Sequence, residues 1–302
     1  MLLAYRGSVN RWECDENDHL NVRFYMQKHW QTLVAGLQTF AAVPAASLGS
    51  LSEGGLRVQQ VRFLAECRIA DPLSGYWSVV RGDNGALQVL TELRHSLSDQ
   101  VRSSCVHQFE SGLLDGLGDV EIQHVDGVVE DLPDHAGGRG VADEDLGYCD
   151  LALHQLADYG FKVIGMGCVS PEETLSSGCL AMHHYMGRLS DSMPHLWAGL
   201  GRSHAPLGQG QGDGDGGAVL EYRLRYHQPL RINQCFVVHS GLMESGAKLQ
   251  RFAHLCFARD TGKLAVSAEA VGVRMDLLTR KARVMSDGEQ ARMRQQQLLP
   301  YA

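Results

Sequence analysis

The chain has 302 residues, more than the ~100–200 of a usual domain, so two domains are the first expectation. With 44% hydrophobic and 21% charged residues, it has the composition of a globular protein that can bury a sizeable core. Its net charge of -8 argues against nucleic-acid binding, which needs a basic surface to neutralise phosphates.

The first residues and the cysteines predict a cytoplasmic protein. The segment 1–6 is too short and becomes polar too early for a secretory signal, and no apolar run approaches the ~18 residues of a membrane span. The eight cysteines form no Cys-x-x-Cys pair, so we expect reduced thiols that mostly fill the core.

The first half of the chain predicts a strand, a long helix and four further strands. After the strand-like segment 5–12, apolar residues recur at spacings of four and three, typical of one helix face. These residues are Val22, Met26, Trp30, Leu33, Leu37 and Phe40. A polar loop over 45–55 leads to strand-like runs at 57–67, 75–81, 86–96 and 101–109.

The second half repeats landmarks of the first about 160 positions later, which favours a duplicated unit. Pro72-Leu73 before a Val-Val pair has its counterpart in Pro229-Leu230, and Asp99 in a polar turn has its counterpart in Asp260. The alternative is that two β-rich halves merely share turn residues. A shorter helix is expected around 193–200, a flexible loop over 208–217, and strands at 218–227, 234–243, 248–259 and 264–277.

One helix followed by antiparallel strands in each half predicts the α+β class. We expect an N-terminal unit over 1–125, an exposed acidic, glycine-rich linker over 126–150 and a C-terminal unit over 151–285. The polar tail over 286–302 is expected to be a surface helix or a disordered end.

The densest cluster of polar residues is D-E-N-D-H-L-N at 15–21, directly before the long helix. The first backbone N–H groups of a helix lack partners and carry partial positive charge, so they can stabilise an oxyanion. A carboxylate beside them can activate water or attack a carbonyl. The alternative is that these residues only cap the helix, a role that suits Asn21.

The segment Trp12-Glu13-Cys14-Asp15, followed by His19-Leu20-Asn21 and Tyr25, resembles 4-hydroxybenzoyl-CoA thioesterase-like hotdog proteins. The spacing of Asp15, Asn17 and His19 is also similar to the Asp-x-Asn-x-His motif of acyl-carrier-protein thioesterases. The resemblance implies two hotdog units in tandem, each a curved antiparallel sheet wrapped around a long helix.

Carried over residue by residue, the resemblance makes Asp15 the catalytic carboxylate and gives Asn17 and His19 the task of orienting it or the water. Asn21 would cap the helix, and Asn21 and Tyr25 are expected to border the substrate. Many relatives have Gly before the His, where this chain has Asp18. A second charge there would raise the pKa of Asp15 if both side chains pointed inward, or would face solvent.

In the second half, the segment 185–191 is expected to form the corresponding turn before a helix. It resembles a Gly-Arg-apolar-Ser-Asp turn of some bacterial double-hotdog proteins, which makes Arg188 and Asp191 candidate substrate-binding residues. The alternative is that they only brace the turn. His183 and His184 are expected on a strand, facing opposite sides, so we expect no metal there, and no sequence motif calls for a cofactor.

These features favour hydrolysis of an acyl-CoA, with an acyl-carrier-protein thioester as a variant substrate. Hydration or dehydration of an acyl thioester and a non-catalytic acyl-thioester-binding module are the alternatives. Cys14 is disfavoured as a nucleophile because it should point away from Asp15 on a strand. A Gly-x-Ser-x-Gly motif is absent from the sequence.

The expected partners are the acyl thioester and, in a homo-oligomer, further copies of the chain, but no nucleic acid and no membrane. We expect one active site per chain, with the first unit supplying the chemistry and the second a pocket wall. Six basic residues are candidates for contacting CoA phosphates, and the sequence favours none of them over the others: Arg57, Arg62, Arg223, Arg225, Arg280 and Lys281.

Overall fold

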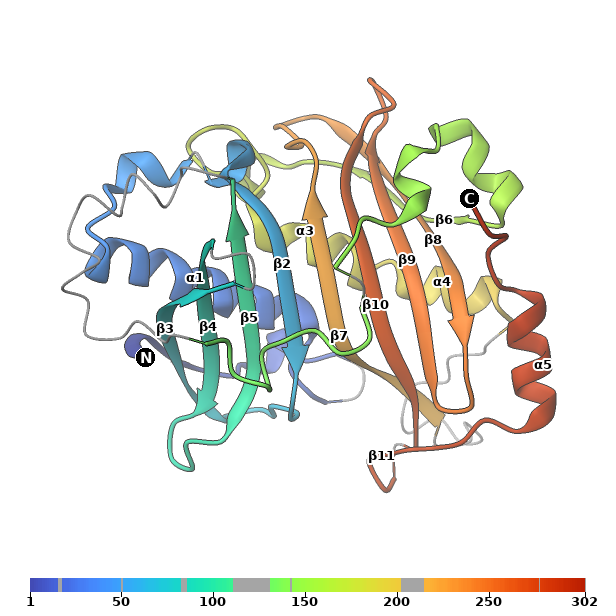
Figure 1. The fold of residues 1–302 in the computed structure, drawn as a ribbon, viewed down its shortest axis with the longest axis horizontal. Helices are drawn as coiled ribbons and strands as arrows, with labels where there is room; N and C mark the ends of the chain where they lie inside the picture. The colour runs from blue at the N-terminus through green and yellow to red at the C-terminus, as the bar shows by residue number, and fades with distance from the viewer. Residues whose placement is uncertain are drawn as a thin grey trace.

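The computed structural model describes residues 1–15, 18–49, 51–82, 86–110, 131–141, 143–201, 215–276 and 278–301. Ten of its strands form one continuous antiparallel sheet in the order β1-β3-β4-β5-β2-β7-β10-β9-β8-β6, with β11 paired to β10 (Figure 1). This sheet and its few helices confirm the α+β class.

The first half folds as the sequence pattern predicts. Its elements are β1 (Leu2–Ser8), α1 (Val22–Phe40), β2 (Leu56–Phe63), β3 (Pro72–Arg81), β4 (Leu87–His95) and β5 (Val101–Phe109). The helix predicted from its apolar stripe is confirmed. The loop expected over 45–55 instead contains two short helical turns, Ala45–Leu48 and Leu51–Gly55.

The second half repeats this order with one difference in its helical part. Its elements are β6 (Lys162–Cys168), α3 (Met182–Ser190), α4 (Met193–Gly199), β7 (Asp215–Tyr226), β8 (Cys235–Ser245), β9 (Leu249–Ala258), β10 (Leu264–Asp276), β11 (Lys281–Ala282) and α5 (Asp287–Gln295). The helix expected around 193–200 is present, but a second helix, α3, precedes it.

The prediction of a strand at His183-His184 and of a turn over 185–191 was therefore wrong. Met182, Tyr185, Met186 and Leu189 are buried on one face of α3, with the spacing of three and four that a helix requires. The helix is only nine residues long, and an apolar pattern this short does not distinguish a helix from a strand.

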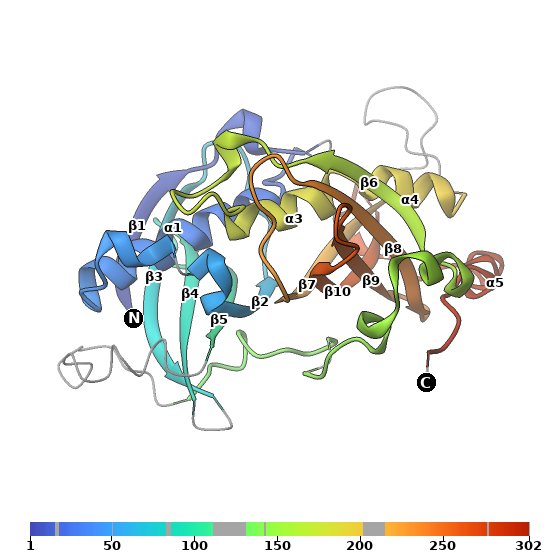
Figure 2. The same ribbon diagram turned by 90° about the horizontal axis from the view of Figure 1, so that it is seen from above.

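The strand order is symmetric about the β2–β7 pair, which confirms the duplication. In this central pair Val61 lies opposite Tyr222 and Gln59 opposite Leu224, so the two units form one sheet. The sheet curves around α1 and α3, which lie together on its concave side (Figure 2). At Gly36 of α1, an added Cβ would lie 2.2 Å from the ring of Trp77, so this close helix–sheet contact requires glycine.

The connection between the units is attached to the sheet and is not a free linker. Its described part crosses the convex side of the sheet (Figure 2), with Ala136 buried against Val80, Leu90 and Val106. The Glu221 carboxylate accepts hydrogen bonds from the backbone of this segment at 139 and 140. Ala136 and Leu146 are buried, and the other residues of the linker that the structure describes are exposed or half-buried.

Two further features differ from or complete the sequence picture. Cys168 and Cys235, opposite one another on β6 and β8, form a disulfide, so the expectation of eight reduced cysteines was wrong for this pair. In the C-terminal tail, α5 is capped by Ser286, and Leu298 packs closely on Gly241 of β8. In the described part of the chain, no helix is long and apolar enough to cross a membrane.

Candidate active site

The loop before α1 is closed by its own backbone. The Asp15 amide donates to the carbonyl of His19 at 2.9 Å, and the Asp18 amide donates to the carbonyl of Asp15 at 3.1 Å. Asp18 has a φ of 59°, a left-handed conformation that aspartate tolerates better than most residues. Its side chain is exposed, so it faces solvent. Asn17 lies outside the described residues.

Asp15 and His19 form the central polar pair of this loop. His19 Nδ1 lies 3.0 Å from Asp15 Oδ2, and both side chains are largely buried, with 16% and 14% of their surfaces exposed. Burial alone lowers the pKa of His19, but the hydrogen bond and charge of Asp15, together with the charge of Glu66, raise it above its ordinary value on balance.

The N-terminus of α1 is capped as predicted. Asn21 Oδ1 accepts a hydrogen bond from the Arg23 amide at 2.9 Å, and the Asn21 carbonyl accepts from the amides of Phe24 and Tyr25. Within the described residues, the first helical amide, that of Val22, has no such acceptor, and Val22 borders a large cavity. This leaves one donor of the helix N-terminus available at the site.

A buried ion pair fixes the loop to the helix. Lys28 Nζ on α1 lies 2.8 Å from Glu13 Oε1, with 4% and 9% of the two side chains exposed. The Glu13 carbonyl also accepts from the Asn21 amide. Below it, the Tyr25 hydroxyl accepts from the Cys67 amide and donates to the Ala65 carbonyl. Asp15 is therefore held between two anchored elements.

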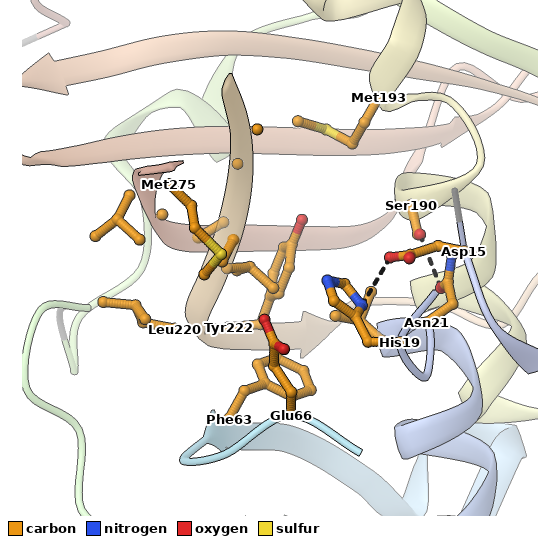
Figure 3. Close-up of a pocket in the computed structure, with 18 of the residues that line it drawn as sticks. Asp15, His19, Asn21, Phe63, Glu66, Ser190, Met193, Leu220, Tyr222 and Met275 are labelled. Carbon is orange, nitrogen blue, oxygen red and sulfur yellow. Dashed lines mark hydrogen bonds and ion pairs between the residues drawn. The ribbon is translucent and has the colours of Figure 1, made fainter. Parts of the chain in front are cut away.

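Asp15 and His19 border a cavity of about 810 Å³ that extends into the second unit (Figure 3). Its apolar walls come from α4, β7, β9 and β10. They include Met193, Trp197, Leu220, Phe252 and Met275. Figure 3 shows the second ring nitrogen of His19 directed into this space. The size and apolar lining suit a small-molecule ligand.

The corresponding loop of the second unit has lost the polar pair. Glu173 and Arg188 form an ion pair there that matches Glu13 and Lys28, and the bridge between Thr174 and Leu180 matches that between Cys14 and Leu20. At the same offset of about 160 positions, Leu175 stands for Asp15 and Cys179 for His19. The cavity beside this second helix measures only about 10 Å³.

The two predicted residues of the second unit lie in different places. Arg188 pairs with Glu173, stacks on the ring of Phe236 and does not border the large cavity. Asp191 borders the cavity and pairs with Arg23 at 2.9 Å, with half of its side chain exposed. Of the six basic residues proposed for CoA phosphates, only Arg280 borders the cavity.

Several cavity residues were missed from the sequence. Ser190 donates to Asn21 Oδ1 at 3.0 Å and thereby connects the end of α3 to the cap of α1. Glu66 on the loop after β2, Arg102 on β5 and Tyr222 on β7 also border the cavity. The helical spacing of the apolar residues in α3 was the signal that could have placed Ser190. Among the described residues, no group of His, Cys, Asp or Glu could hold a metal ion.

No family model matches the sequence, and no curated protein matches it. Solved structures share its fold over nearly the whole chain. One is a Lactobacillus plantarum protein assigned as an oleoyl thioesterase, with a TM-score of 0.60, 12% identity and coverage of 90% of this chain and 96% of that one.

The 12:0-ACP thioesterase of Umbellularia californica has a TM-score of 0.58 and 8% identity, with 89% and 93% covered. An acyl-ACP thioesterase of Bacteroides thetaiotaomicron has a TM-score of 0.57 and 7% identity, with 89% and 96% covered. At these identities the likeness shows the fold, which is the double-hotdog arrangement that the sequence predicts.

Proposed function

We propose that this protein hydrolyses acyl thioesters at a single site built around Asp15. The observation that carries the proposal is the Asp15–His19 pair, at 3.0 Å, beside the N-terminus of α1 and at the border of an apolar cavity. A carboxylate, a helix N-terminus and an acyl-sized cavity are the three parts that thioester hydrolysis needs.

The acyl chain would lie in the cavity of the second unit, with its thioester carbonyl at Asp15. Asp15 would take a proton from water as the water oxygen bonds to the carbonyl carbon, or its own oxygen would attack that carbon. In both cases the tetrahedral intermediate collapses, the C–S bond breaks and the thiolate leaves with a proton. On the second route this leaves the acyl group bound to Asp15 as an anhydride, which a water then hydrolyses to release the acid and restore the carboxylate. The products are a carboxylic acid and a thiol on either route.

The negative oxygen of the intermediate would be stabilised by the Val22 amide. That amide is the first of α1 and has no acceptor within the described residues, so it adds to the positive end of the helix. A preorganised donor of this kind contributes about 10²–10³ in rate.

His19 would orient Asp15 through Nδ1 while Nε2 faces the substrate. Its raised pKa, caused by the Asp15 carboxylate, increases the protonated fraction near neutral pH. A protonated imidazole beside the thioester favours departure of the thiolate by supplying positive charge.

The difference between the two loops supports one site per chain. Leu175 and Cys179 replace the pair in the second unit. The cavity at the start of α3, lined by Met182 and Tyr185, measures about 10 Å³, against about 810 Å³ for the cavity at Asp15. Of these two cavities, only the one at Asp15 is large enough for an acyl group.

The experiment that tests the proposal uses both acyl-CoA and acyl-carrier-protein thioesters as substrates. Two of the similar structures are acyl-ACP thioesterases, so carrier-protein thioesters stand beside acyl-CoA thioesters as candidates. Purified protein is incubated with a panel of both, and thiol release is followed with a thiol reagent. Turnover of at least one thioester is expected. Tight binding of acyl thioesters without turnover would instead identify a binding module.

A further inference from the structure

The large cavity exists because the two units fill the space between helix and sheet differently. In the first unit α1 continues for 19 residues, whereas in the second α3 ends at Ser190 and α4 starts again at Met193. The sheet residues opposite also differ. Gln59 on β2 pairs with His107, and at the matching place Tyr222 on β7 pairs with Ala270.

In the first unit, the polar side chains around the Gln59–His107 pair form hydrogen bonds with one another. His107 bonds to Gln59 at 3.0 Å and to Thr91 at 2.9 Å, and His29 bonds to Thr91 at 2.8 Å. The Tyr226 hydroxyl donates to Gln59 Oε1 at 2.5 Å. These fully buried side chains fill the space and close the network without a ligand.

In the second unit, the hydroxyl at the matching position, that of Tyr222, is not part of such a network of described residues. The Tyr222 side chain is 3% exposed and borders the cavity, and within the described residues its hydroxyl makes no hydrogen bond. Figure 3 shows this hydroxyl directed into the space between Met193 and the Asp15–His19 pair. Burial raises the pKa of Tyr222, so the hydroxyl stays neutral and can donate.

A second polar atom without a partner among the described residues lies nearby, on a residue that does not border the cavity. His254 is fully buried, its Nδ1 is bonded to Ser240 at 2.7 Å, and its Nε2 has no hydrogen-bond partner in the described part of the chain. Its ring centre lies 5.7 Å from that of Tyr222. Of these two residues only Tyr222 borders the cavity, so its hydroxyl is the donor that a polar group of a bound molecule could satisfy.

A plain hydrocarbon chain in this cavity would displace water from Tyr222 and leave a buried hydroxyl without a partner. Leaving such a group unsatisfied costs about 1–3 kcal/mol, whereas a polar group at the same level gains a hydrogen bond. We infer that the preferred acyl group carries a hydroxyl or carbonyl oxygen that bonds to Tyr222. This inference rests on the proposed thioesterase function and specifies its substrate class.

The test compares matched acyl-CoA thioesters of one chain length. One member is unsubstituted, and the others carry a hydroxyl or oxo group near the thioester, at mid-chain or near the methyl end. The wild type is expected to show a higher kcat/KM for at least one oxygenated member. In Tyr222→Phe, kcat/KM for that member falls about 10-fold, while that for the plain chain stays equal or rises.

Tyr226→Phe is the matched control, since Tyr226 lies on the same face of β7 but bonds to Gln59. This variant should lower the stability of the protein and change kcat/KM by the same factor for plain and oxygenated thioesters. An equal effect of Tyr222→Phe on plain and oxygenated chains would overturn the inference while leaving the hydrolase intact.

If no thioester is turned over, the proposed function fails, and the inference is then decided with the free acids. Calorimetry would show tighter binding of an oxygenated acid, lost in Tyr222→Phe. Equal affinities of all acids for the wild type would overturn it.

Discussion

At the scale of single residues, the loop before α1 combines a structural and a chemical role. Asn21 caps the helix, and Asp15 is left to pair with His19 at the cavity. The sequence is compatible with both helix capping and catalysis for these residues, and the geometry of the folded loop decides which residue has which role. Residue type and order identify the loop, but only the folded chain shows which side chain faces the cavity and which faces solvent, as Asp18 does.

The raised pKa of His19 predicts a pH-dependent contribution to stability. The folded protein favours protonated His19, so the stabilisation is present below the unfolded pKa of about 6.5 and is lost as pH rises through the folded pKa. The stability difference between wild type and His19→Gln should therefore be larger at about pH 6 than at about pH 9. Urea unfolding at both values measures it, and a difference that grows with pH would contradict the assignment.

At the scale of elements, the predicted long helix and most strands are confirmed, because their apolar periodicity extends over enough residues to be unambiguous. The short α3 was missed, and with it the true position of Arg188. Repeat spacing held the missing information: Glu13 and Lys28 recur as Glu173 and Arg188 at the same offset. The cavity could not be predicted, since it depends on where α3 stops relative to β7 and β10.

The two ion pairs at the helix starts make a matched comparison. Lys28→Met leaves the buried Glu13 without its partner, which costs about 3–5 kcal/mol. Because Glu13 anchors the loop that carries Asp15, kcat should also fall by ~10-fold or more. Arg188→Met breaks the pair of the second unit, which is more exposed, so it should cost less stability and leave kcat unchanged. A similar loss of kcat in both variants would place Arg188 at the substrate after all.

At the scale of the whole molecule, the duplicated units share one sheet but contribute different parts of the candidate site. The first supplies the polar loop, and the second supplies the walls of the cavity. Mirrored strand order was foreseeable from recurring landmarks. The docking of the connection on the convex side and the Cys168–Cys235 disulfide were not, because both depend on contacts between segments distant in sequence.

Buried histidines predict loss of stability in acid. Burial lowers the pKa of His107, His183 and His254 to about 3 each, so they stay neutral in the folded protein. The unfolded chain binds protons at these residues below about pH 6.5, and stability then falls by about 1.4 kcal/mol per pH unit for each histidine. The urea concentration at the unfolding midpoint should fall as the pH is lowered from about 6 to about 4. In His254→Gln it should fall less steeply with pH. A constant midpoint over this range would refute the prediction.

The most direct test of the single-site proposal is a comparison of kcat for Asp15→Asn and Asp191→Asn on the best thioester of the panel. Both carboxylates border the cavity, but only Asp15 pairs with His19 beside the start of α1. Asp15→Asn should fold, as circular dichroism can verify, and lose about 10³-fold or more in kcat, while Asp191→Asn changes KM or stability by modest factors. A folded Asp15→Asn protein with near-normal kcat, or a larger loss from Asp191→Asn, would contradict the account.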